Sequence, residues 1–402
     1  MQTWWKEKKE WKTNSIKSSA KSAVYFFWGF TIFWNLISYT PFLSEKSIFA
    51  EMSRKPEVAM VFLFPLIGLI LLGLSIRATQ QWRRFGQTPL EMDPFPGCIG
   101  GQVGGQISIN LPYSKQHKFS VSLSCRKSYI TGSGKNRRRT EKVVWQTEGV
   151  CHHERGPKGT RLSFRFDVPS DQPETEPNNQ KTYILWKVNV SAELKGVDFE
   201  REYTIPVFKS EAPVLSSLKE GTEQHPLTQS QAEDGVYSIA QFQAVDGGVE
   251  AYFPALQRPV PGISLSLFGA IFTAAGWFAG YMGAPAMFPI VFCTVGLGIF
   301  FGGIFYLAKS LQVRVNSSGL TARRFLFGYP LTTRVIDADV IKSIDIVQGS
   351  TMQHGNKTTV IYQVVAKSHA GKKAKVAERL TSRAEAERIK EMYEMYLGSG
   401  KV

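Results

Sequence analysis

Residues 263–308 read "ISLSLFGAIFTAAGWFAGYMGAPAMFPIVFCTVGLGIFFGGIFYLA" and contain no acidic or basic side chain. The stretch divides into two apolar runs, 263–283 and 285–308, with little more than "GAPA" between them. Each run has the length that an α-helix needs to cross a hydrocarbon core of about 30 Å. A buried core helix, the alternative, is usually shorter and is seldom apolar on every face. The stretch therefore predicts a tight hairpin of two membrane-spanning helices.

Two more apolar runs of similar length, residues 23–43 and 58–76, lie near the N-terminus. With the first pair they predict four spans, arranged as hairpins over residues 22–77 and 262–308. No span carries Asp, Glu, Lys or Arg well inside it. Transporters and proton pumps usually need such groups at depth, so the pattern disfavours transport.

The distribution of lysine and arginine predicts how the chain is oriented. Six lysines precede the first run, and Arg77, Arg83 and Arg84 follow the second run. Because basic residues near spanning helices concentrate on the cytoplasmic side, both segments are expected inside the cell. The sequence thus predicts a multi-pass protein of the cytoplasmic (inner) membrane. Both termini and the blocks 77–262 and 309–402 would be cytoplasmic.

The leader, residues 1–21, alternates tryptophan with lysine. Tryptophan favours the depth of the lipid headgroups, and lysine reaches anionic lipid. We therefore expect a set of residues at the membrane interface: Trp4, Trp5, Trp11, Arg83 and Arg84. The alternative is a basic tail that only sets the orientation of the first span.

The chain has a formal net charge of +15 and only four cysteines. Much of the excess of lysine and arginine lies in segments expected to face the negative cytoplasmic leaflet. We therefore expect these segments to bind anionic lipid headgroups. Nucleic acid would also suit this charge, but we predict no nucleic-acid partner. The cysteines are too few and too scattered for a disulfide framework.

Residues 95–208 alternate apolar and polar side chains in short segments that turn residues separate. This pattern predicts an antiparallel β-sandwich. Three stretches resemble parts of an arrestin-type domain: "PFPGCIGGQVGGQISI" at 94–109, "SFRFDVPSDQPETEP" at 163–177 and "YILWKVNVSAELKGVDFEREYTIPV" at 183–207. The resemblance implies one sandwich lobe. The whole chain resembles a family of bacterial membrane proteins in which such a domain sits between pairs of spans.

Residues 209–261 are expected to be a linker followed by a hairpin that leads into the third span. Residues 309–402 read as short strands followed by a helix, "SRAEAERIKEMYEMYLG", with Ser382 as its cap. This order resembles a bacterial pleckstrin-homology-like domain, which implies binding of lipids or peptides. The expected fold class is a membrane α-helical protein of four spans, with an all-β cytoplasmic arrestin-like sandwich and a small β-rich pleckstrin-homology-like domain that ends in a helix.

The stretch "TGSGKNRRRTEK" at 131–142 carries the densest positive charge of the middle block. It lacks the glycine spacing of a nucleotide-binding loop, and strands rather than a helix flank it. It predicts a hairpin tip whose cations contact an anionic lipid or partner: Lys135, Arg137, Arg138 and Arg139. A solvated turn without function is the alternative.

The stretch "CHHE" at 151–154 contains metal-ligand side chains. Adjacent residues of a strand point to opposite faces, so His152 and His153 cannot both turn toward one ion. We predict no metal site and no cofactor. No nucleophile and base stand at a meaningful spacing either, so we predict no enzymatic activity.

Glycines at helical spacing predict close packing between the third and fourth spans: Gly269, Gly276, Gly280, Gly298 and Gly302. Gly269 is expected near Gly298, and a dimer interface is the alternative. The expected function is a non-catalytic membrane scaffold or adaptor that recruits an unknown cytoplasmic protein. A sensor of lipid or envelope state that binds anionic headgroups is the second hypothesis, and a membrane hydrolase or transporter is the third. The oligomeric state stays open.

Overall fold

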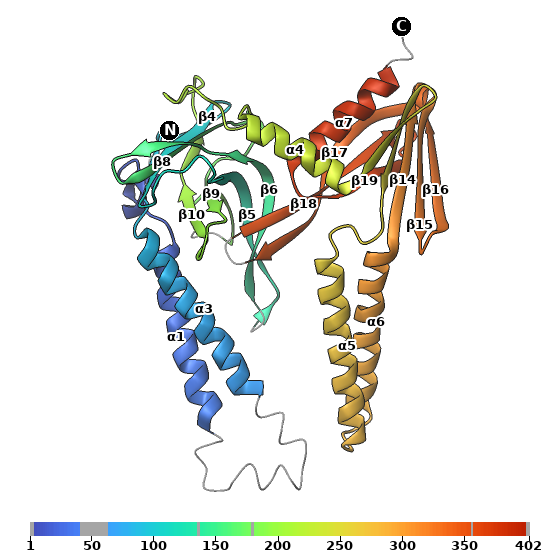
Figure 1. Ribbon diagram of the computed structural model, residues 1–402, viewed down its shortest axis with the longest axis horizontal. Helices are drawn as coiled ribbons and strands as arrows, with labels where there is room; N and C mark the ends of the chain where they lie inside the picture. The colour runs from blue at the N-terminus through green and yellow to red at the C-terminus, as the bar shows by residue number, and fades with distance from the viewer. Residues whose placement is uncertain (1–3, 41–62, 135–136, 178–180, 355–356, 399–402) are drawn as a thin grey trace. The chain divides into compact units, whose positions relative to one another are not determined.

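The computed structural model describes residues 4–40, 63–134, 137–177, 181–354 and 357–398 (Figure 1). The chain forms two compact units: an N-terminal unit up to residue 228 and a C-terminal unit from residue 229, with the short segment 353–358 grouped with the first. Each unit contains a pair of helices lying side by side and its own antiparallel sheets. The prediction that apolar helices are combined with antiparallel β-sheets is therefore confirmed.

The helices of the N-terminal unit are α1 (Ala20–Tyr39) and α3 (Leu63–Phe85). The predicted end of the first span and the predicted start of the second lie outside the described residues. Helix α3 continues nine residues beyond the predicted end at Ile76, so it carries Arg77, Arg83 and Arg84 on its last turns. The apolar run did not predict this extension, because the last turns of α3 carry polar and basic side chains.

A polar seam joins α1 to α3. The hydroxyl oxygens of Thr31 and Ser75 lie 2.8 Å apart, and the indole N–H of Trp28 donates to the Thr79 hydroxyl at 2.9 Å. Hydrogen bonds of this kind hold helices together where no water competes for the polar groups.

The sheets of the N-terminal unit share one hydrophobic core, to which Phe164 and Trp186 both contribute. One sheet has the order β1 (Ser15–Ile16), β2 (Leu90–Met92), β4 (Gln102–Ile109), β8 (Gly159–Asp167), β7 (His152–Gly156). The second has the order β10 (Phe199–Ile205), β9 (Thr182–Ala192), β5 (Ser120–Thr131), β6 (Arg138–Val150), and β3 (Gly97–Ile99) pairs with β11 (Val207–Lys209). The longer strands fall where alternation predicted them, because every second side chain enters this core.

The leader is folded onto the β structure of the N-terminal unit, which differs from the expected interfacial segment. Short 3₁₀ helices at Trp4–Glu7 and Lys9–Trp11 bury Trp5 and Trp11 in the hydrophobic core, with Trp4 packed against it. The Trp11 indole N–H donates to the Thr204 carbonyl oxygen at 3.1 Å. Protein covers the rings of Trp5 and Trp11, since the sheets offer apolar contact and a carbonyl acceptor together.

The helices of the C-terminal unit are α5 (Val260–Tyr281) and α6 (Met287–Ala308). Among the described residues, three helical segments are long and apolar enough to cross a membrane: Phe64–Phe85, Val260–Tyr281 and Met287–Ala308. Helix α1 is not one of the three. A crossing by α1, and with it the count of four spans, stays a prediction.

A glycine seam joins α5 to α6, but it uses only part of the predicted set. A Cβ at Gly269 would lie 2.7 Å from the Gly296 carbonyl oxygen, and a Cβ at Gly276 would lie 2.6 Å from the Phe292 Cβ. A Cβ at Gly298 or Gly302 would meet nothing within 4 Å. The expectation for Gly298 and Gly302 is therefore wrong, and Gly296 and Gly303 take their place. These two glycines are seven residues apart, about two helical turns, so they lie on the same face of α6, the face that packs against α5. At Gly280 the fit is looser, since an added Cβ would lie 3.1 Å from the Pro289 Cβ.

The first sheet of the C-terminal unit has the order β12 (Gln241–Val245), β13 (Gly248–Phe253), β14 (Lys309–Asn316), β15 (Gly319–Leu326), β16 (Tyr329–Asp337). A second sheet contains β17 (Ile341–His354), β18 (Lys357–Ser368) and β19 (Lys373–Leu380), and α7 (Arg383–Gly398) follows it. The expected hairpin before the third span is β12–β13. Its second strand, β13, pairs with β14, which follows the two helices in the sequence. The segment expected as a linker contains α4 (Pro226–Ile239).

Helix α7 begins as the sequence predicted. The Ser382 hydroxyl accepts the backbone N–H of Ala384 at 3.1 Å, and the Glu385 carboxylate accepts the N–H of Thr381 at 3.0 Å. This arrangement resembles a capping box and satisfies backbone donors that the first helical turn leaves unpaired.

Replacing Gly269 by valine should destabilise the α5–α6 hairpin by about 1–3 kcal/mol, because the side chain would overlap the backbone of α6. Gly298→Val is the matched control, since its side chain would enter open space. Thermal unfolding of the full chain in detergent measures both. Equal midpoints for the two variants would contradict the assigned seam.

Trp11→Ala should destabilise the N-terminal unit by about 3–5 kcal/mol, the usual cost of removing a buried aromatic ring. Denaturant unfolding followed by tryptophan fluorescence measures the change, with the exposed neighbour Lys12→Ala as control. A leader that lay free of the sheets would give the same stability for both variants.

Candidate functional site

The predicted basic loop is the tip of the β5–β6 hairpin. Gly132 and Gly134 have φ of 82° and 56°, the left-handed conformation that tight turns require of glycine. Arg137 and Arg138 are exposed. Arg139 packs back on the sheet, where its guanidinium donates to Ser128 at 3.2 Å and lies 4.8 Å from the Tyr183 ring. Lys135 lies outside the described residues. The tip therefore has three exposed arginines among the described residues, of which Arg139 is tied to the sheet.

The histidines of "CHHE" are separated by the strand that holds them. The His152 ring lies 4.5 Å from the His225 ring and 2.8 Å from the Glu220 carboxylate, whereas His153 approaches the Ser114 carbonyl at 3.1 Å. Burial and the neighbouring His152 lower the pKa of His225. In the part of the chain that the structure describes, no group of three His, Cys, Asp or Glu is arranged to hold a metal ion.

The last turns of α3 are fixed to the turn between β9 and β10. The Arg77 guanidinium pairs with Asp198 at 2.8 Å, and that of Arg84 donates to the carbonyl oxygens of Lys195 and Val197 at 2.8 and 3.0 Å. Arg84, expected at the membrane interface, therefore serves this junction. Arg83 remains exposed on the same turns.

A buried guanidinium closes the end of α3. Arg201 of β10 donates to the Gly86 carbonyl oxygen at 3.2 Å and to the Thr88 hydroxyl at 3.0 Å. The Tyr203 hydroxyl donates to the Thr88 carbonyl oxygen at 2.6 Å. Burial lowers the pKa of Arg201 and raises that of Tyr203. These groups serve the connection between helix and sheet.

A second buried guanidinium closes the end of α6. Arg379, which follows Glu378 on β19, donates to the carbonyl oxygens of Tyr306 and, at 3.2 Å, of Gln257. Beside it, Glu378 pairs with Lys309 at 3.0 Å and with Arg324 at 3.2 Å. Burial acts to raise the pKa of the Glu378 carboxyl, but these cations hold the pKa below its ordinary value.

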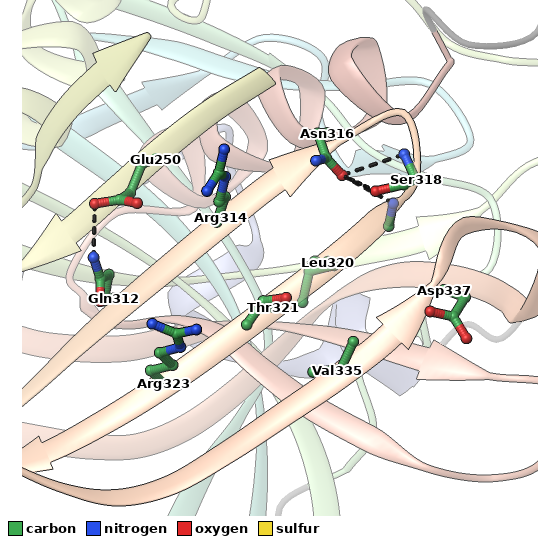
Figure 2. Close-up of a pocket in the computed structure, with 11 residues that line it drawn as sticks. Glu250, Gln312, Arg314, Asn316, Ser318, Leu320, Thr321, Arg323, Val335 and Asp337 are labelled. Atoms are coloured by element: carbon green, nitrogen blue, oxygen red, sulfur yellow. Dashed lines mark hydrogen bonds between the residues drawn. The ribbon is translucent and has the colours of Figure 1, made fainter. Parts of the chain in front are cut away.

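A shallow pocket of about 400 Å³ lies on the outer face of the β12–β16 sheet (Figure 2). Strand register places Arg314 opposite Thr321, and Gln312 opposite Arg323, so the arginines occupy diagonal positions on β14 and β15. Diagonal neighbours of this kind are roughly 7–8 Å apart. The other lining residues are Glu250, Asn316, Ser318, Gly319, Leu320, Val335 and Asp337.

The two guanidiniums of the pocket are exposed to solvent. Glu250 accepts a hydrogen bond from Gln312 at 2.7 Å, and Asn316 accepts the Ser318 hydroxyl at 2.7 Å. Within the described residues, Arg314 and Arg323 form no ion pair, and Figure 2 shows both beside the polar lining. Glu250 and Asp337 balance the charge of the two arginines, so the pocket suits a polar partner that presents acidic groups to the arginines and hydrogen-bond donors to the carboxylates, and does not suit a bare polyanion.

Sequence reasoning did not select this pocket. The usable signal was the alternation "LQVRVN", which places Arg314 on the polar face of its strand. What the sequence lacked was the register that brings Arg323 beside Gln312.

Comparisons with known proteins add little. No protein-family model matches the chain, and no curated protein matches it. Among solved structures the chain matches Spo0M, a sporulation control protein from Bacillus subtilis, over 77% of its own length and 97% of that chain, with 12% sequence identity and a TM-score of 0.21. A likeness at this TM-score carries no argument, so the function has to follow from the residues themselves.

Glu378→Gln should lower the free energy of unfolding at neutral pH by about 1.5–3 kcal/mol, because Lys309 and Arg324 lose their shared carboxylate. Since the folded pKa lies below the ordinary 4.5, the native contribution is complete above that pH and disappears as the pH falls through the folded pKa. Unfolding of the full chain in detergent at neutral and acidic pH measures this.

The control is Asp246→Asn, at the exposed β12–β13 turn. Native protein and control should lose stability together in acid, whereas Glu378→Gln should lose less. Parallel pH curves for all three proteins would refute the role of Glu378.

Proposed function

We propose that the protein is a non-catalytic adaptor of the cytoplasmic membrane. Apolar helices hold it in the bilayer, and its β domains recruit a protein partner. The observation that carries the proposal is the pocket on the outer face of the β12–β16 sheet, where Arg314 and Arg323 present guanidiniums without ion-pair partners among the described residues. Guanidinium groups bind carboxylates through paired hydrogen bonds, so a partner's acidic side chains would bind here in a defined orientation.

The place of the pocket in the chain favours a protein over lipid as its partner. Arg314 is the sixth residue after Ala308, the last residue of α6, and Arg323 pairs with Gln312, the fourth. At about 3.3 Å for each strand residue, β14 can carry these positions roughly 13–20 Å from the helix end. Headgroup layers are only about 5–8 Å thick on each side of the hydrocarbon core.

The proposed membrane placement uses four spanning helices, one more than length and apolar character alone identify. Three helices have the required length and apolar character, and the proposal adds α1 as the fourth span. The polar side chains of α1 support this, since Thr31 and Trp28 find hydrogen-bond partners on α3. Satisfied polar groups are the condition for placing them in lipid. The lysines before α1 support cytoplasmic termini.

The proposal keeps the resemblances as descriptions of the two β domains. Two antiparallel sheets over one core support an arrestin-like sandwich for residues 95–208. Strands β14–β16 and β17–β19, followed by α7, support a pleckstrin-homology-like domain for residues 309–402, and β12 and β13 add to its first sheet from before the helices. Domains of both kinds bind other molecules and do not catalyse reactions, which is what an adaptor requires.

Packing accounts for the pKa shifts of two buried groups that could otherwise be read as catalytic. Burial raises the pKa values of Cys151 and Tyr393, and both side chains lie in hydrophobic cores. Such shifts follow from packing and prepare no nucleophile for an open cleft.

A photo-crosslinking amino acid at Val335, which lines the pocket, tests the adaptor function. In native membranes, the full chain should form a specific adduct with a protein, and Arg314→Ser with Arg323→Ser should abolish it. Lys342→Ser with Lys372→Ser is the matched control, because it removes the same charge from exposed positions outside the pocket. An adduct that survives the arginine changes, or no protein adduct at all, would contradict the proposal.

Binding of anionic headgroups is the second candidate function, and the exposed Arg137 and Arg138 at the β5–β6 tip favour it. A fluorophore at Ser133 of the full chain in nanodiscs should report it. Adding anionic lipid should shift its emission, and raising the salt concentration should reverse the shift. Arg137→Ser with Arg138→Ser should remove the response, and a response equal to native would leave the tip as a solvated turn.

A further inference from the structure

Five large apolar side chains are exposed around the end of α6. Leu256 and Val260, at the entry to α5, are 62% and 70% exposed. Phe327, Tyr329 and Leu331, at the β15–β16 turn, are 65%, 78% and 53% exposed. Single exposed apolar residues are common, but these come from two distant segments and meet at one place. We call them the apolar collar.

Backbone hydrogen bonds fix the collar to the helix end. The N–H of Leu256 donates to the Leu307 carbonyl oxygen at 2.8 Å, and that of Phe327 donates to the Ala308 carbonyl oxygen at 3.2 Å. Strand register places Tyr329 opposite Leu326, and Leu326 opposite Lys309, the first residue after α6. The collar therefore lies at the level where α6 ends.

The turn that presents Phe327 departs from local preference. Phe327 and Gly328 form the two-residue connection between Leu326 and Tyr329, with φ of 50° and 83°. Turns with positive φ at both central positions favour Asn-Gly, and a bulky residue at the first position is strained. Leu256 also has positive φ, 60°. Strained residues of this kind cluster at contact sites, so the two positions are candidates for contact with a ligand or surface.

We propose that the apolar collar inserts into the boundary between headgroups and acyl chains of the bilayer, around the end of the α5–α6 hairpin. Aromatic side chains favour this depth. The inference rests on the proposed membrane placement of α5 and α6. With the collar inserted, the β domain of the C-terminal unit contacts the bilayer directly, in addition to its attachment through α5 and α6.

Depth-dependent fluorescence quenching tests the collar on the full chain in nanodiscs. Cys293 is first replaced by alanine, since the other three cysteines are buried. Single cysteines then carry a fluorophore at Tyr329, at Asp337 on the other end of β16, and at Val295 within α6. Lipids with quenchers at shallow depth should quench the label at 329 and spare that at 337, and deep quenchers should reach the label at 295.

The outcomes separate the collar from the membrane placement. If the label at 295 escapes quenching, the placement of α6 in the bilayer is wrong. If the label at 295 is quenched but those at 329 and 337 behave alike, the collar does not touch lipid. Self-crosslinking of the cysteine at 329 without quenching would instead identify a second copy as the occupant of this surface and overturn the inference.

Phe327→Asn distinguishes insertion from folding. Asparagine suits the turn better than phenylalanine, so the β15–β16 hairpin should be retained and its thermal stability unchanged or raised. Quenching of the label at 329 should nevertheless fall toward that at 337, because the apolar anchor is gone. Undiminished quenching in this variant would contradict the role of Phe327.

Discussion

Two buried guanidinium groups hold the ends of the apolar helices to the sheets. The last carbonyl groups of a helix have no partner within it and carry the negative end of its dipole. Arg201 donates to Gly86 just after α3, and Arg379 donates to Tyr306 in the last turn of α6. Each arginine belongs to a strand of its own unit, so helix and sheet share one rigid junction. The surfaces proposed for partner and lipid both depend on such a junction, since they need a fixed relation to a helix end.

The two helix pairs solve the same packing problem with different side chains. In the proposed membrane placement, apolar attraction between helices is weak, so close backbone approach or hydrogen bonding holds them together. Helices α5 and α6 use glycines, with Gly269 against Gly296. Helices α1 and α3 use hydroxyl and indole groups, such as Thr31 with Ser75. The hydroxyl groups of α1 and its Trp28 serve this seam.

Local patterns in the sequence predicted most strands because alternation follows from burying one face of a sheet. Strands β5, β9 and β14 all agree with the alternating runs. The same reasoning failed for the leader, since Trp5 and Trp11 look identical in sequence whether lipid or protein covers them. It also failed for Gly298 and Gly302, because a small-residue spacing names a helix face without naming the face that its neighbour uses.

The sequence by itself determined the apolar helices, the alternating strands and the cap of α7, because each depends on residues close together along the chain. The tertiary structure decided which polar groups are satisfied and which are left for a partner. Arg379 reaches Gln257 across 122 positions, whereas Arg314 and Arg323, of the same residue type, stay in an open pocket. That difference arises from strand register and long-range contact, which no local pattern encodes.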